Sequence, residues 1–195
     1  MLEWQKRMTN FSRYFVAICV LLVGAPALAQ VCNQAIERGN HPSRYQIDPS
    51  NPGEALDLVT SLVWQRCEMN RVINDQNTVD VLDDTCDEPP ENQDDDTTNN
   101  TQLTFNWLQA TERAELEGNG YRIPNLKELS SLLELACFNP AIDPDVFPGA
   151  TQGPAWTSTP HADEGFEVWS IDFSGGNDQT QSKASFLPVR LVRDL

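Results

Sequence analysis

Carboxylates are the side chains of this sequence best placed to bind a metal ion. The run Asp94-Asp95-Asp96 closes an acidic stretch, and Ca²⁺ prefers several oxygen ligands from a flexible loop. Asp172 and Asn177 flank the Gly175-Gly176 turn and form a second candidate. Neither set has the Asp-x-Asp-x-Asp-Gly register of an EF-hand. We therefore expect solvated carboxylates at both places, keep calcium as the alternative, and assign no metal or other cofactor.

Indole rings are the side chains most suited to carbohydrate binding, because their large apolar face fits a pyranose ring. Trp156 follows Gly153-Pro154 at the start of a short extended segment. It is the candidate ligand contact, together with Asp172 and Asn177. Three further tryptophans fall inside patterned elements and are predicted to belong to the core: Trp64, Trp107 and Trp169.

Arg122 precedes Pro124 in an extended stretch. Its guanidinium offers five donors in a rigid fork, which suits a carboxylate ligand as well as an internal acidic side chain. We expect the internal role, with backbone carbonyls, Glu128 or Asp143 as partners. Replacement of Arg122 by alanine is then expected to destabilise the fold.

No arrangement in the sequence favours catalysis. Ser158, His161 and Asp163 lie close together along the chain, but a catalytic triad is defined by positions in space, so sequence neighbours are no evidence for one. The carboxylates are numerous enough for a glycosidase pair, yet nothing in their spacing selects one. We therefore predict a protein that is not an enzyme.

The first 29 residues have the pattern of a secretory signal peptide. Lys6, Arg7 and Arg13 form a positively charged start, and Ala27-Leu28-Ala29 is a small-x-small cleavage site. Between them, Tyr14 to Val23 is an apolar run too short to span a bilayer. We predict removal of residues 1–29 and export to the periplasm or the cell exterior. A retained membrane anchor is the alternative.

The chain is strongly acidic, with 29 acidic and 13 basic residues and a net charge of −16. Without the leader, the count becomes 28 against 10, a net charge of −18. Such a surface repels phosphate backbones, anionic lipid leaflets and sulfated polysaccharides. We therefore exclude nucleic acid as a partner and expect no binding of sulfated glycosaminoglycans.

Four cysteines remain once Cys19 leaves with the leader. An even number in an exported domain is typical of disulfides, and four cysteines allow three connectivities. A metal site would need closely spaced cysteine and histidine pairs, and the sequence has none. The four are Cys32, Cys67, Cys86 and Cys137.

The hydrophobic pattern predicts a single domain over residues 30–195, with its core in 55–195. Proline and glycine break the pattern in 30–61, so that part is expected to be loop-rich. A strand is predicted over 62–66. Residues 68–100 carry eleven carboxylates and few apolar side chains, so we expect a long acidic surface loop, part of it a hairpin.

Two helices and three strands are predicted after this loop. Thr104 is expected to cap a helix that ends at Glu117, and Asn125, with Glu128 in a capping box, begins a second helix that runs to Ala136. Short strands follow near Trp156, at 166–173 and at 186–192, with a turn at 174–177. This order indicates an α+β domain with an antiparallel sheet.

The sequence resembles the Lcl C-terminal domain family, named after the domain that ends the Legionella collagen-like adhesin. Seven blocks carry the resemblance, in the family order. They are Leu62-Val63-Trp64-Gln65-Arg66-Cys67, Trp107-Leu108-Gln109-Ala110, Tyr121 to Leu129, Pro140-Ala141-Ile142-Asp143 with Phe147-Pro148, Ala155-Trp156-Thr157-Ser158-Thr159, Val168 to Phe173, and Val189-Arg190-Leu191-Val192-Arg193.

The resemblance implies a C-type-lectin-like fold, with two helices packed on a small twisted sheet, loop-rich and stapled by disulfides. With the resemblance, the expected pairs are Cys67–Cys86, which bracket one loop, and Cys32–Cys137. The block residues expected to have structural roles are Trp64, Arg122, Pro124, Glu128, Trp169 and Arg190.

The implied function is non-catalytic binding at or outside the inner membrane. We expect a carbohydrate or another cell-envelope component as the ligand. The alternative is a structural or assembly subunit that contacts only protein partners. The adhesin's binding of sulfated glycosaminoglycans does not transfer to so acidic a chain, and the sequence leaves the oligomeric state open.

Overall fold

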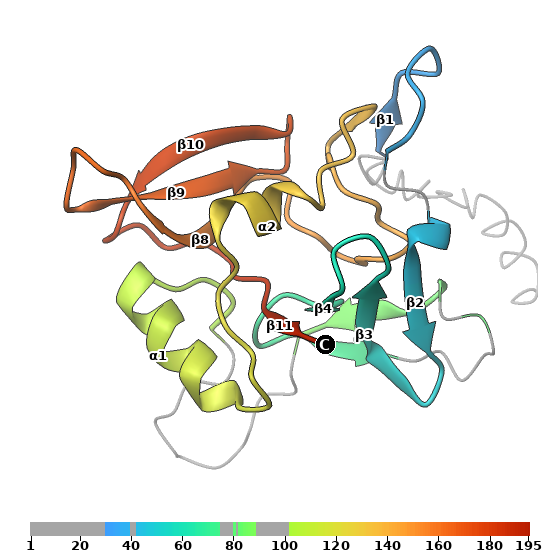
Figure 1. Cartoon of the computed structure of the whole chain (residues 1–195), viewed down its shortest axis with the longest axis horizontal. Coiled ribbons are helices and arrows are strands. Elements are labelled where there is room, and N and C mark those ends of the chain that lie inside the picture. The colour runs from blue at the N-terminus through green and yellow to red at the C-terminus, as the bar shows by residue number, and fades with distance from the viewer. Residues whose placement is uncertain (1–29, 40–41, 75–79, 81, 89–101) are drawn as a thin grey trace, which may run out of the picture.

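The computed structural model describes residues 30–39, 42–74, 80, 82–88 and 102–195. In these residues, eleven strands form four antiparallel sheets, and the α-helical elements are short. The two larger sheets lie beside each other, with α2 between them and α1 below the sheet that contains β9 (Figure 1).

The first large sheet joins segments from both ends of the described chain. Its strand order is β11-β4-β3-β2. The central pair is a hairpin in which Glu54 pairs with Gln65 and Asp57 with Leu62, and Val192 pairs with Trp64 on the other side of β4. Its strands are β2 (Tyr45–Asp48), β3 (Asn51–Asp57), β4 (Leu62–Gln65) and β11 (Val192–Asp194).

The second large sheet is a three-stranded meander in the order β10-β9-β8. The β9–β10 turn has Gly176 at a φ of 79°, a conformation that glycine adopts without steric cost. The Asp172 carboxylate accepts a hydrogen bond from Ser174 N at 2.8 Å and holds this turn. The strands are β8 (Pro154–Pro160), β9 (Glu167–Asp172) and β10 (Asn177–Ser182).

Two small sheets each contain a cysteine that forms a disulfide. β1 (Val31–Cys32) pairs with β7 (Cys137–Phe138), where Cys32 and Cys137 are register partners joined by a disulfide. β5 (Val72–Asn74) pairs with β6 (Thr85–Asp87), which carries the Cys67–Cys86 bond. The bonded pairs are the ones expected, and the predicted hairpin inside the acidic region is present.

Each helix begins with an asparagine capping box. α1 (Trp107–Glu117) is capped by Asn106, whose side chain accepts from Gln109 N, and α2 (Leu126–Ser130) is capped in the same way by Asn125. Such caps satisfy amide groups that the first helical turn leaves without partners. The expected cap at Asn125 is therefore confirmed, whereas the expected cap at Thr104 is wrong by two residues. A 3₁₀ turn, η1 (Pro42–Arg44), precedes β2.

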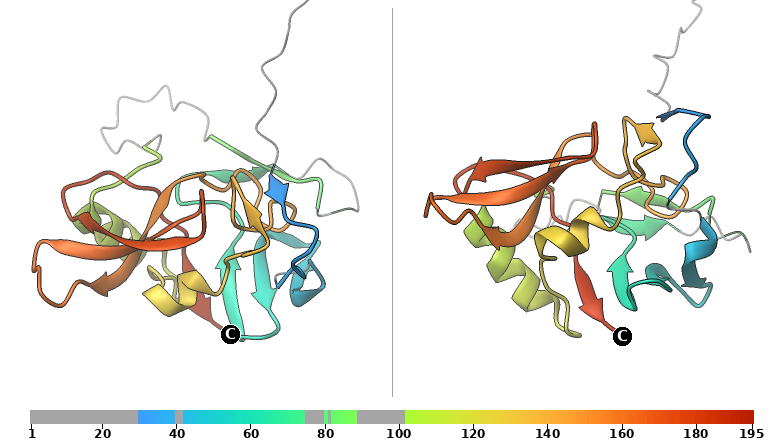
Figure 2. Two further views of the ribbon diagram at one scale, coloured as in Figure 1. Left: turned by 90° about the horizontal axis from the view of Figure 1, so that it is seen from above. Right: turned by 45° about the horizontal axis from the view of Figure 1, so that its top comes forward.

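Two apolar clusters fill the interior. One lies between the large sheets and α2 and centres on Trp64, Phe147 and Leu129. The other lies under α1 and centres on Phe105, Trp156 and Leu191. Figure 2 shows from two further sides how α1 and α2 approach the β8–β10 sheet.

The expected α+β fold, two helices packed on a small twisted sheet, is wrong, and a C-type-lectin-like arrangement is not confirmed. The described chain is mostly β. α2 has only five residues because the hydroxyls of Ser130 and Ser131 bond back to the carbonyls of Leu126 and Glu128, which offers the backbone an alternative to further helical turns.

Two other expectations also need correction. Residues 30–61 were expected to be loop-rich but hold β1, β2 and β3. The acidic region is only partly a surface loop, because Glu68 and Asp84 are 8% and 5% exposed. These two carboxylates face buried guanidinium groups: Asp84 lies 2.6 Å from Arg66, and Glu68 lies 3.8 Å from Arg190.

Candidate functional site

A groove of about 520 Å³ lies between α1 and the segment that leads into α2. This volume lies within the range of small-ligand sites, which combine apolar walls with a few polar groups. Helix α1 forms one wall, residues 121–128 form the other, and Ser158 of β8 lies at the edge. The lining residues are Trp107, Thr111, Ala114, Glu115, Tyr121, Arg122, Ile123, Asn125, Glu128 and Ser158.

The spacing of α1 explains the helical wall. Trp107, Thr111 and Glu115 are four residues apart, so they lie on one helical face, with Ala114 buried below them. The indole of Trp107 is only partly buried. Its Nε1 donates to Thr157 O at 3.0 Å, and Lys183 Nζ lies 4.9 Å from the ring centroid. These contacts hold the ring at the mouth of the groove.

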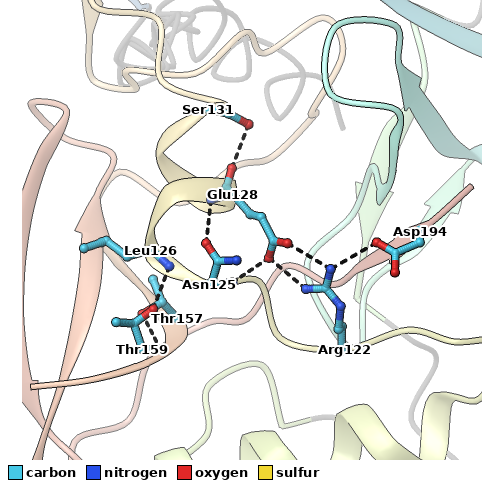
Figure 3. A network of polar contacts seen from close by, with 8 residues as sticks. All are labelled: Arg122, Asn125, Leu126, Glu128, Ser131, Thr157, Thr159 and Asp194. Atoms are coloured by element: carbon cyan, nitrogen blue, oxygen red, sulfur yellow. Dashed lines mark hydrogen bonds and ion pairs between the residues drawn. The ribbon is translucent and has the colours of Figure 1, made fainter.

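The opposite wall is organised by Arg122 (Figure 3). Its Nη1 and Nη2 donate to the two oxygens of Glu128 at 2.7 and 2.9 Å, and Nη2 also reaches Asp194 Oδ1 at 3.3 Å. The Glu128 carboxylate also accepts a hydrogen bond, at 2.7 Å, from the backbone N–H of Asn125, which is the cap residue of α2. Arg122 thus joins the start of α2 to β11 and has the internal role expected for it.

The electrostatics of this wall depend on Glu128. Burial on its own would raise the pKa of Glu128, but hydrogen bonds from Arg122 and Asn125 outweigh it, so the pKa lies below its ordinary 4.5. Glu128 therefore stays ionised at neutral pH and keeps Arg122 paired. A carboxyl whose pKa is lowered on folding stabilises the folded state above its unfolded pKa, and this contribution disappears as the pH falls through the folded pKa.

We expect Arg122→Ala to lower the free energy of unfolding by about 1 kcal/mol at neutral pH, because the bidentate pair with Glu128 is only partly buried. The difference should shrink as the pH falls through the lowered pKa of Glu128 in the native fold, because Glu128 is then protonated in both proteins. Urea unfolding at several pH values measures it. Lys127→Ala is the matched control, because Lys127 is an exposed neighbour. Equal stabilities of Arg122→Ala and the native chain at neutral pH would contradict the structural role.

The structure reverses the expected roles of the tryptophans. Trp156 is 0% exposed, and its Nε1 donates to Phe105 O at 2.7 Å, so the prediction that it contacts a ligand is wrong. Trp64 is buried as expected. Trp107 and Trp169, both expected in the core, are only partly buried, and Trp107 lines the groove. Trp169 instead packs edge-on against His161.

The candidate oxygen ligands are not brought together with the groove. Asp172 and Asn177 are register partners at the β9–β10 turn, and neither lines the groove. Asp94, Asp95 and Asp96 lie outside the described residues. Within the described part of the chain, no group of three or more histidine, cysteine, aspartate or glutamate residues is placed to hold a metal ion. Ligand binding by Asp172 and Asn177 stays a prediction.

The remaining block residues are structural supports. Arg190 is 1% exposed, donates to the carbonyls of Gln65 and Arg66, and lies over the Phe147 ring at 4.9 Å. Burial lowers the pKa of Arg190 to about 10, which still leaves it charged at neutral pH. Pro124 is buried beside the groove, and its carbonyl accepts from Ser158 N at 2.8 Å.

A comparison with protein families decides the affiliation of the chain. A model described as the Lcl C-terminal domain matches residues 53–193. The chain belongs to the Lcl C-terminal domain family. A search of curated proteins finds no match to it.

The matched range contains the whole groove of this Lcl C-terminal domain and the Cys67–Cys86 disulfide. Cys32 lies before it, so the Cys32–Cys137 bond attaches a preceding segment to the matched region. Two disulfides are typical of proteins in an oxidising compartment outside the cytosol. Neither helix of the described residues has the length and apolar character needed to cross a membrane.

Proposed function

We propose that this Lcl C-terminal domain is an exported, non-catalytic, adhesin-like module that binds carbohydrate in the groove between α1 and residues 121–128. The groove itself carries the proposal. It presents a partly exposed indole at Trp107 next to hydroxyl, amide and carboxylate groups. Sugars need this combination, because a pyranose has an apolar face and a rim of hydroxyl groups.

The walls of the groove are held in place before a ligand arrives. The Arg122–Glu128 pair, the Asn125 cap and the bond from Trp107 to Thr157 O fix four of the lining side chains. Ordering these groups in advance lowers the entropy cost of binding. A preformed groove of this kind supports a binding function, because binding alone requires no nucleophile or general base.

Blocking the groove should weaken carbohydrate binding strongly. Ser158 is exposed at the groove edge, so we expect Ser158→Trp to fill the mouth and weaken binding on a glycan array at least tenfold. Gln152→Trp, which is exposed and outside the lining, is the matched control. Equal array signals for Ser158→Trp and Gln152→Trp would rule out this groove. A silent array for the native protein would rule out carbohydrate as the ligand.

A structural or assembly subunit is the alternative function, and one observation favours it. Val31 and Phe138 are register partners of β1 and β7 and are 49% and 46% exposed. Exposed apolar side chains beside each other are typical of protein contacts. A single stoichiometric partner in a pull-down, lost in Phe138→Ser, together with a silent glycan array, would support this alternative.

The proposed compartment follows from the leader and the disulfides. Residues 1–29 lie outside the described residues, and their sequence pattern supports export with cleavage after Ala29. Mass spectrometry of the protein from its native compartment tests the cleavage, and an intact Met1 would contradict it.

A further inference from the structure

Glu115 is an exposed carboxylate on the helical wall of the groove. Among the described residues, no hydrogen bond or ion pair involves its side chain, in contrast to Glu117 at the end of the same helix. The Glu117 carboxylate accepts from Gln65 Nε2 at 2.7 Å. Glu115 therefore faces the groove with a charge that no other described residue neutralises.

Two cationic side chains lie beside the groove, Arg122 and Lys183, and Arg122 is already paired with carboxylates. Both terminal nitrogens of Arg122 donate to Glu128, and one also reaches Asp194. Lys183 lies over the Trp107 ring, and its Nζ donates to Gly165 O at 2.8 Å. The Lys183 ammonium therefore keeps further donors at the Trp107 end of the groove, whereas Glu115, two helical turns further along α1, offers a ligand amine a carboxylate without a partner among the described residues.

The wider field acts in the same direction. The chain carries a net charge of −16, which raises the local concentration of cations and lowers that of anions near its surface. At the end of the groove that Glu115 lines, the local charge and the charge of the whole molecule therefore favour a ligand of the same, positive sign.

We infer that the groove selects saccharides that carry a protonated amino group, with Glu115 as the residue that determines this specificity. The inference rests on the proposed function, because it assigns the charge of the sugar that Trp107 contacts. Trp107 and Glu115 are eight residues apart on α1, about 12 Å along the helix axis. This span is longer than one pyranose ring, so the expected ligand is an oligosaccharide of amino sugars.

Two probes that differ only in this charge test the inference. The first is the tetramer of glucosamine, at a pH below the pKa of its amines, and the second is the neutral tetramer of N-acetylglucosamine. Isothermal titration of the full chain should show tighter binding of the glucosamine tetramer, and added salt should reduce the difference. Glu115→Gln should weaken binding of the glucosamine tetramer about fivefold and leave the acetylated tetramer unaffected.

Glu112→Gln is the matched control, because Glu112 is exposed on α1 and does not line the groove. Tighter binding of the acetylated tetramer, or equal effects of Glu115→Gln and Glu112→Gln, would overturn the inference. If neutral glycans bind and Ser158→Trp blocks them, the proposed function stands while the amino-sugar specificity fails. If only a lysine-rich peptide binds, both the saccharide function and this inference fail.

Discussion

Arg66→Ala is expected to lower the free energy of unfolding by about 3–5 kcal/mol. The Arg66 side chain is fully buried and donates to Asp84 Oδ2 at 2.6 Å, to Val146 O at 2.9 Å and to Pro52 O at 2.8 Å. Its removal leaves the buried Asp84 carboxylate without its counter-charge and takes away the hydrogen bonds to the carbonyls of Val146, Pro52 and Asp145. A buried charge that loses its partner is among the largest single destabilising effects known.

Urea unfolding followed by tryptophan fluorescence measures the Arg66 effect. Arg71→Ala is the matched control, because Arg71 lies in the same segment and is partly exposed, so its loss should cost less than about 0.5 kcal/mol. Arg66→Met combined with Asp84→Leu should recover much of the stability, because the pair is then removed as a whole. Arg66→Ala and Arg71→Ala variants of equal stability would contradict the buried pair.

Loss of the Cys32–Cys137 disulfide is the second large effect. The bond closes a span of 105 residues, whereas Cys67–Cys86 closes 19. Loop-closure entropy assigns about 4.7 kcal/mol to the longer span and about 3 kcal/mol to the shorter one. Replacing Cys32 and Cys137 by alanine should therefore destabilise the chain more than replacing Cys67 and Cys86.

Thermal unfolding of the two double variants, under identical conditions, gives the order of the effects. The control is the native protein after reduction, which should be less stable than either variant because it lacks both bonds. A Cys67 and Cys86 variant that is clearly the less stable of the two would show that native contacts of the β5–β6 hairpin, rather than chain entropy, dominate.

Local signals in the sequence predicted the elements that local chemistry determines. The cap at Asn125, the turn at 174–177, the strand at β4 and the partner of Arg122 depend on residues within a few positions of one another. The same reasoning missed β10, whose residues Asn177 to Ser182 are all polar. An edge strand held mainly by its pairing with β9 has no apolar alternation that a sequence pattern would show.

The tryptophans show why the groove was not predicted. Trp156 looked exposed because it follows a proline, but Ala155, Trp156 and Thr157 are all buried, since both faces of β8 are covered. Trp107 looked like core because it starts a helical stripe, yet that stripe buries Ala110 and Ala114 and leaves the indole at the groove. Which residues of an apolar helical stripe become buried depends on the segments that pack against the helix, and these lie far away in the chain.

The buried carboxylates show the same limit for charge. Glu68 and Asp84 belong to a region whose composition indicates a solvated loop. The composition describes the region as a whole, so it does not show which single carboxylates are buried. Each of them lies against an arginine of a distant block, Arg190 and Arg66. Glu68 and Asp84 could have been recognised as buried only if their pairing with Arg190 and Arg66 had been known.

The Cys32–Cys137 bond also determines how the domain responds to mechanical load. A pulling force applied between residue 32 and the C-terminus passes through the covalent bond directly to residue 137. Residues 33–136, including β3, β4, α1 and α2, then lie off the load path and cannot be extended while the bond is intact. Only residues 137–195 can be extended by such a force, and the pairing of β11 with β4 and with Arg122 is the first contact that it loads at the C-terminal end.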